Sequence, residues 1–243
     1  MNGPERFEFK FLITAPQRDA ALTAFNGDLQ PDANGASGGV YPIVSLYYDT
    51  PDRRCYWEAW RGLPSRRKLR VRIYGTADGG IAPTSFGEVK HKLDGLGVKR
   101  RVQTSLPQAL AIGAGGGAAE HFAAPEARVV REVQRLVNED GFRPVCALRY
   151  RRHAFSLATE AATEPLRITF DDELGGRFRD LQPEPDDRRH DFTLLPADHL
   201  VMEVKGAGAV PFRVSRWLAK SGLSPRGFSK YCAALRLAAP PSA

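Results

Sequence analysis

The sequence predicts an α+β fold: a mainly antiparallel β tunnel barrel of about eight strands with a charged interior, flanked by amphipathic helices. One observation is the strict alternation of residues 68–74, where Leu69, Val71 and Ile73 share one face and cations occupy the other. A second is repetition, because at least five other segments alternate in the same way, with polar faces made mostly of Lys, Arg and Glu. A third is a set of amphipathic helices that need an apolar surface to cover. These helices are expected at residues 15–26, 125–139 and 211–220.

Length, composition and charge limit the class of protein. The 243 residues suit a single domain, residues 1–243, and the hydrophobic content of 42% is enough for a core. The net charge of +7 favours an anionic partner: nucleic acid, an anionic membrane or a phosphate-rich small molecule. No run of about 18 apolar residues occurs, so no transmembrane helix is expected. The chain has an odd number of cysteines, three, and they are widely separated: Cys55, Cys146 and Cys232. We therefore expect reduced thiols in a cytoplasmic protein.

The N-terminal part of the chain begins with an alternating strand. In residues 6–13 every second side chain is apolar, and Glu8 and Lys10 lie on the opposite face. Thr14 is placed to cap the helix that follows. The other elements expected before residue 75 are a loop at residues 30–39, a strand at 43–49, a short helix opened by Thr50 and the strand at 68–74.

A hairpin is the strongest local prediction. Residues 85–93 and 98–104 form its strands, and a turn at residues 76–83 precedes it. The Asp94-Gly95 pair joins the strands, because it tolerates the positive φ of a tight turn. Alternation favours Lys99 and Arg101 for the charged face over Arg100, but which of the three faces the tunnel stays open.

The C-terminal part continues the same pattern. Residues 113–119 are small and form a linker within a helical insert, and no Gly-Lys-Ser/Thr sequence follows that would make them a phosphate loop. Strands are expected at residues 143–157, 166–171 and 199–205, irregular structure at 175–190, and a last helix at 230–237 capped by Ser229.

The charged faces are expected to point into the barrel. Pointing outward, their like charges would repel across neighbouring strands, and the helices would lack apolar surface to cover. Burying cations without partners is costly. Glu8, Glu88, Asp171 and Glu203 offset part of this cost. Asp171 is expected to orient Arg167, with coordination of a metal as the alternative. The remainder implies a polyanion, or ordered water and anions, inside the barrel, where arginines suit bidentate contacts with phosphate.

Eight short motifs, in one order along the chain, are similar to those of the vacuolar transporter chaperone (VTC) domain. This is the polyphosphate polymerase branch of the CYTH, or triphosphate tunnel metalloenzyme, superfamily. The motifs are Arg6-Phe7-Glu8-Phe9-Lys10, Ser45-Leu46-Tyr47-Tyr48-Asp49-Thr50, Lys68-Leu69-Arg70-Val71-Arg72, Glu88-Val89-Lys90, Arg152-His153-Ala154-Phe155, Arg167-Ile168-Thr169-Phe170-Asp171, Glu203-Val204-Lys205 and Phe228-Ser229-Lys230-Tyr231. Each motif is weak alone, but the set spans nearly the whole chain. Arg6 stands where the wider superfamily has an acidic residue; the VTC branch shares this change, which favours a polymerase.

The resemblance implies a role for each matching residue. Glu203 would be the metal ligand for Mn²⁺ or Mg²⁺, with Glu8 as its acidic partner; the alternative for Glu203 is a structural ion pair with Lys205 or a tunnel arginine. Lys230, near the tunnel mouth, would be the essential lysine and act in catalysis together with Arg70 and Arg72. The residues expected to bind substrate phosphates are Lys10, Arg70, Arg72, Lys90, Lys99, Arg101, Arg152, Arg167 and Lys205.

The function implied by the resemblance is transfer of the γ-phosphate of ATP to inorganic polyphosphate. The alternatives are hydrolysis of triphosphate or polyphosphate in the same tunnel, and a module that binds polyphosphate without catalysis. A nucleic-acid binder is disfavoured, because no stacking aromatics interleave with the basic runs at residues 66–68 and 99–101. No membrane segment is expected in this chain, and a separate membrane partner stays open.

Overall fold

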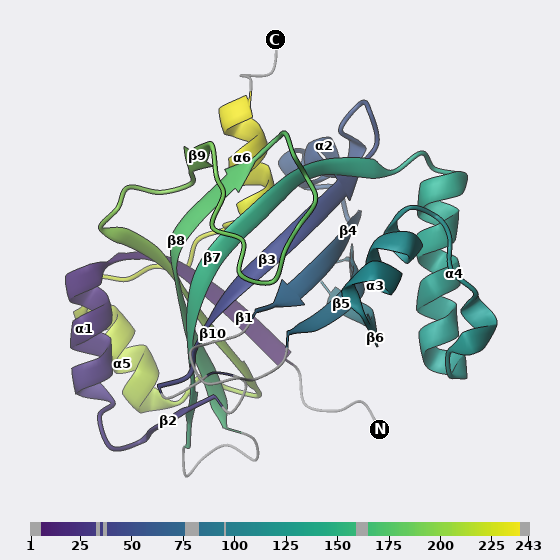
Figure 1. Cartoon of the computed structure of the whole chain (residues 1–243). Coiled ribbons are helices and arrows are strands. Elements are labelled where there is room, and N and C mark those ends of the chain that lie inside the picture. The colour runs from purple at the N-terminus through teal and green to yellow at the C-terminus, as the bar shows by residue number, and fades with distance from the viewer. Residues whose placement is uncertain are drawn as a thin grey trace.

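The fold is built on one curled antiparallel sheet (Figure 1). The computed structural model describes residues 6–32, 35, 38–75, 83–94, 96–158 and 165–238. Its strands are β1 (Arg6–Thr14), β2 (Leu29–Pro31), β3 (Val40–Asp49), β4 (Ser65–Tyr74), β5 (Thr84–Leu93), β6 (Leu96–Thr104), β7 (Arg143–Leu157), β8 (Leu166–Arg177), β9 (Phe192–Thr193) and β10 (His199–Ala207). The main order is β1-β10-β8-β7-β3-β4-β5-β6, with β2 paired to β7 and β9 to β8. The predicted fold class is confirmed.

The helices cover the outer face of the sheet and one of its ends. They are α1 (Ala15–Ala24), α2 (Arg54–Trp60), α3 (Leu106–Gly113), the short 3-10 helix η1 (Ala119–His121), α4 (Ala124–Asn138), α5 (Phe212–Lys220) and α6 (Lys230–Ala238). Figure 1 shows α1 and α5 together on one flank, α3 and α4 on the other, and α6 at the top. The amphipathic pattern explains the placement of α4, since its Val130 and Val133 are buried in one cluster with Val71 of β4 and Val102 of β6.

Strand register decides which side chains share a face. Tyr47 lies opposite Arg70, and Ser45 opposite Arg72, so these four point the same way. Leu69, Val71 and Ile73 alternate with the arginines, and Leu69 and Val71 belong to the cluster under α3 and α4. The expectation that the apolar face of residues 68–74 packs outward is therefore confirmed.

The charged face is the concave one. Glu8 on β1 and Lys90 on β5 stand near opposite ends of the strand order, yet their side chains lie 3.4 Å apart. This contact requires the sheet to curl toward the face that carries both residues. We call this surface the concave face. Its charged residues include Glu8, Lys10, Lys68, Arg70, Arg72, Glu88, Lys90, Lys99, Arg101, Arg152, Arg167, Asp171, Glu203 and Lys205.

Some element predictions differ from the structure. The expected closed sheet is a half-barrel, because among the described strands no ladder joins β1 to β6; the two sides meet through side chains. The loop expected at residues 30–39 contains the end of β2, and β8 extends to Arg177, beyond the expected residue 171. The turn expected at residues 76–83 lies outside the described residues except for Pro83. Asp94 of the hairpin turn has φ +48°, as its sequence predicts, whereas Gly95 lies outside the described residues.

Two further findings concern the cysteines and membrane-spanning segments. Cys55, Cys146 and Cys232 are free thiols. No helix among the described residues combines the length and apolar character needed to cross a bilayer.

Candidate functional site

Glu203 is the hub of the charges on the concave face. Its carboxylate lies 2.5 Å from Lys205 Nζ, 3.5 Å from Arg152 Nη2, 3.6 Å from Lys10 Nζ and 3.9 Å from Lys230 Nζ. Burial by itself would raise the pKa of Glu203, but these four cations hold that pKa well below its ordinary value. Glu203 is therefore ionised, and it forms the ion pair with Lys205 that was the alternative to a metal site.

Asp171 is a second buried carboxylate beside this hub. It is fully buried and accepts two hydrogen bonds from Arg152, at 2.6 and 2.8 Å, and one from Lys230 Nζ at 2.6 Å. Burial by itself would raise the pKa of Asp171, but Arg152 and Lys230 lower it more, so the pKa lies below its ordinary value. The expectation that Asp171 orients Arg167 is wrong, because Asp171 lies opposite Arg152 in the β7–β8 register and reaches that arginine instead.

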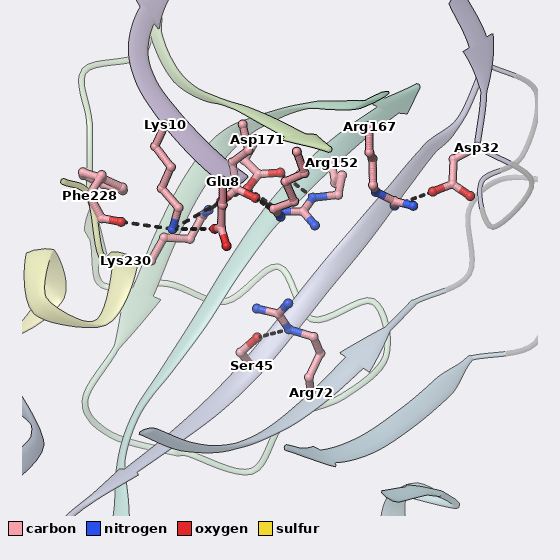
Figure 2. A network of polar contacts seen from close by, with 12 residues as sticks. Glu8, Lys10, Asp32, Ser45, Arg72, Arg152, Arg167, Asp171, Phe228 and Lys230 are labelled. Atoms are coloured by element: carbon pink, nitrogen blue, oxygen red, sulfur yellow. Dashed lines mark hydrogen bonds and ion pairs between the residues drawn. The ribbon is translucent and has the colours of Figure 1, made fainter. Parts of the chain in front are cut away.

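Lys230 lies deeper than its sequence position suggested. Its side chain is only 9% exposed, and its ammonium lies 4.5 Å from the ring centre of Tyr150. Lys230 projects from the first turn of α6 into the concave face, as Figure 2 shows, and its place near a tunnel mouth stays a prediction. This position brings it within reach of any anion that also contacts Lys10 and Arg152.

The two arginines of β4 have different surroundings. Arg70 Nε donates to Glu88 at 2.6 Å, and Arg70 Nη1 donates to the Tyr47 hydroxyl at 3.1 Å. Arg72 is 6% exposed and its Nε donates to Ser45 Oγ at 3.0 Å. Among the described residues no carboxylate lies within ion-pair distance of Arg72. A buried guanidinium without a counter-charge is costly, and a bound anion removes that cost.

Glu88 balances the opposite side of the concave face. It is 1% exposed, pairs with Arg70 and lies 3.8 Å from Lys99 Nζ. Burial would raise the pKa of Glu88, but Arg70, Arg72 and Lys99 lower it to about 2. Alternation with Lys90 on the same strand predicts that Glu88 lies on the charged face. The sequence does not predict its partner, Arg70 of β4, because that pairing depends on strand register.

The rim of the concave face carries the more exposed cations. The side chains of Lys90 and Lys99 are about half exposed. Partial burial lowers the pKa of both lysines; Glu8 opposes this shift at Lys90, and Glu88 opposes it at Lys99. Arg101 lies 4.5 Å from the ring centre of Phe86. Arg100 points outward and forms a bidentate ion pair with Glu132 of α4. The structure thus places Lys99 and Arg101, and not Arg100, on the concave face.

Arg167 is placed apart from the hub. Its guanidinium forms an ion pair with Asp32 and donates to the Tyr41 hydroxyl at 3.0 Å. Sequence reasoning missed Asp32, because it lies in a Gly-, Asn- and Asp-rich loop where nothing in the local pattern indicates a partner 135 positions away.

The Ser229-Lys230-Tyr231 sequence fixes α6 to the sheet. Ser229 Oγ accepts a hydrogen bond from Lys68 Nζ at 2.8 Å and caps the helix through Cys232 N at 3.3 Å. The Tyr231 hydroxyl donates to Asp49. Asp49, at the end of β3, is fully buried and also accepts from the backbone N–H groups of Cys55 and Tyr56 in α2. One carboxylate therefore joins the two helices that close this end of the half-barrel.

The acidic groups can hold a divalent cation only with help from a ligand. Among the described residues, no three His, Cys, Asp or Glu side chains are grouped to hold a metal ion by themselves. Oε1 of Glu203 and Oε1 of Glu8 lie 3.6 and 3.3 Å from the same Lys10 ammonium, so two carboxylates flank one cation position. Mg²⁺ is commonly bound by one or two carboxylates plus substrate phosphates, and this donor set fits that pattern.

A family match and one solved structure agree with this fold. The sequence matches the VTC domain family over residues 5–239. No curated protein matches it. A solved structure from Hippeastrum, described as an adenylyl cyclase candidate with a dominant triphosphatase activity, is 14% identical; the match covers 96% of each chain with a TM-score of 0.53. A structure described as an adenylate cyclase candidate of Vibrio parahaemolyticus is 12% identical, with 98% of this chain and 100% of that chain covered and a TM-score of 0.47.

Proposed function

The chain belongs to the VTC domain family, and from this premise we propose that it transfers the γ-phosphate of ATP to a growing inorganic polyphosphate chain. The observation that carries the proposal is Arg72, a buried cation on the concave face without a carboxylate partner among the described residues. Figure 2 shows Arg72 across from Lys10, Arg152 and Lys230, and this arrangement suits an anion with several phosphates better than a single phosphate.

The proposed reaction needs positioning and charge neutralisation more than covalent chemistry. An oxygen of the terminal phosphate of polyphosphate attacks the γ-phosphorus of ATP, the bond from that phosphorus to the bridging β–γ oxygen breaks, and ADP leaves. We propose that Lys10, Arg152 and Lys230 contact the transferred group, because all three meet at Glu203. Arg70 and Arg72 would hold the neighbouring phosphates. The other proposed substrate ligands are Lys90, Lys99, Arg101, Arg167 and Lys205.

Mn²⁺ or Mg²⁺ is the proposed cofactor, held by Glu203 and Glu8 together with substrate phosphates, where it would neutralise charge on the transferred group. Binding the cation requires Lys10 or Lys205 to give up its contact with Glu203, and an incoming phosphate offers either lysine a new partner. We also propose a reducing, cytoplasmic setting, which rests on the cysteine content alone.

Incubation of the purified protein with ATP and Mn²⁺, followed by gel separation of the products, tests the proposal. We expect ADP together with a ladder of polyphosphate. ADP and free phosphate without polymer would instead establish a triphosphate hydrolase, the second candidate, in which water replaces the acceptor phosphate. Tight polyphosphate binding without turnover would indicate a binding module. Glu203→Gln separates catalysis from binding, because it should abolish turnover by a polymerase or a hydrolase alike, while the cations that bind the polymer remain.

A further inference from the structure

Arg167 is held away from the other candidate phosphate ligands. Figure 2 shows its guanidinium turned toward Asp32, on the side away from Lys10, Arg152 and Lys230. The cations of the hub converge on Glu203 and Asp171, whereas Arg167 has its own counter-charge from a different part of the chain.

The backbone fixes the position of Asp32. Its N–H donates to the carbonyl oxygen of Ala154 in β7 at 2.9 Å, and the N–H of Ala154 donates to the carbonyl oxygen of Gly39 at 2.9 Å. Both ends of the segment 32–39 therefore attach to one residue. Gly39 has φ +69°, and a Cβ there would lie 2.4 Å from the Ala154 oxygen, so this close approach requires glycine. The Asp32 side chain is 9% exposed.

The register places Arg167 directly opposite Lys205 on the β8–β10 pair. Like charges at such a position repel, and here each has a carboxylate: Glu203 at 2.5 Å from Lys205, and Asp32 on Arg167. A phosphate that bridged Lys205 and Arg167 would replace both contacts with stronger, shared ones. To reach it, Arg167 must leave Asp32.

We infer that Asp32 is a positioning residue that withholds Arg167 from the bound anion and so limits how many successive phosphates the concave face grips. This inference deepens the proposed function and rests on it. A triphosphate centred on Arg72 and the hub does not compete with Asp32. A longer polyphosphate extends beyond the hub to Arg167 and does compete, so Asp32 lowers the affinity for long chains selectively.

The test compares tripolyphosphate with a longer polyphosphate of defined length, measured by calorimetry at fixed ionic strength. Asp32→Asn keeps the size of the side chain and the N–H donation to Ala154, and removes the charge. We expect long-chain affinity to rise on the order of tenfold and tripolyphosphate affinity to stay nearly unchanged. Asp32→Ser serves as a second variant if the first is poorly folded.

Two controls isolate the route through Arg167. Glu139→Gln removes one negative charge from an exposed position after α4 and should leave both affinities unchanged. In an Arg167→Gln background, Asp32→Asn should bring no gain. An equal gain for both anions, a gain that persists without Arg167, or no gain at all would each overturn the inference. If the wild-type protein bound neither anion, that result would contradict the proposed function itself, and with it this inference.

Discussion

At the residue scale, the two arginines of β4 show that neighbours on one strand face can have opposite chemistry. Arg70 forms a direct ion pair with Glu88. Among the described residues, the direct contacts of Arg72 are with Ser45, Tyr74 and Tyr150, and Glu88 acts on Arg72 only from beyond ion-pair distance. Arg72 therefore contributes net positive charge inside the half-barrel, and an anion gains more from it than from Arg70.

Arg72→Gln should weaken tripolyphosphate binding by about tenfold or more, since a charge-assisted contact with a buried cation is lost. The free energy of unfolding should stay the same or rise, because a buried unpaired charge is removed. Calorimetric titration and chemical denaturation measure the two effects. Arg100→Gln, on the outward face of the next hairpin, is the matched control and should leave affinity unchanged. Equal losses in the two variants would contradict the special role of Arg72.

Glu88 gives a pH prediction. Its pKa is about 2 in the folded chain against an ordinary value of 4.5, so its stabilising effect is complete above pH 4.5 and is lost as the pH falls toward 2. The effect amounts to roughly 3 kcal/mol. Glu88→Gln should lower the free energy of unfolding at neutral pH, and the gap from wild type should close as the pH falls through this range. Urea unfolding at several pH values measures it; a gap that is independent of pH would contradict the prediction.

At the element scale, α6 shows how a short helix delivers one functional side chain. Three consecutive residues, Ser229, Lys230 and Tyr231, reach Lys68 on β4, Asp171 on β8 and Asp49 on β3. Tyr231 also stacks on Tyr47, with ring centres 5.3 Å apart. These contacts anchor the start of α6 to three strands, so the sheet sets the position of Lys230.

Tyr231→Phe should loosen this anchor while keeping the aromatic packing. Loss of the hydroxyl leaves part of the Asp49 carboxylate unsatisfied in a buried place, at a cost of about 1–3 kcal/mol. We expect a lower midpoint of thermal unfolding and faster hydrogen exchange in α6 and α2, which share Asp49. Leu237→Ala, at an exposed position of the same helix, should change neither quantity. Unchanged exchange in α2 would show that Asp49 does not couple the two helices.

At the scale of the whole molecule, the half-barrel is held together across its opening by charge. Lys90 on β5 meets Glu8 on β1, and both are partly exposed. Such a contact is weak in water, so the gap between β1 and the β5–β6 hairpin is the part of the sheet that a bound polyanion can tighten most.

Tripolyphosphate should therefore stabilise the folded chain. A ligand at one hundred times its dissociation constant adds about 2.7 kcal/mol to the free energy of unfolding. We expect a rise in the thermal midpoint that grows with ligand concentration and shrinks with added salt. Sulfate at matched ionic strength should give a smaller shift, because it contacts fewer cations at once. Equal shifts from sulfate and tripolyphosphate would contradict a site built for linked phosphates.

The sequence alone determined which side chains share a face. Alternation has a period of two residues and is a local property, so it placed Arg70, Arg72, Lys99 and Arg101 on one face before any partner was known. The need of the amphipathic helices for apolar cover then decided that this face is the inner one.

Only the tertiary structure decided which charges neutralise each other. Arg152 pairs with Asp171, Arg167 with Asp32, and Arg72 with no carboxylate of the described residues. These pairings depend on register and on the curl of the sheet, which join segments far apart in the sequence. The same holds for the depth of Lys230, since its exposure is set by where α6 meets Asp49. Local pattern fixes the direction of a side chain, but long-range packing fixes its partner, and the partner determines how much charge remains for a ligand.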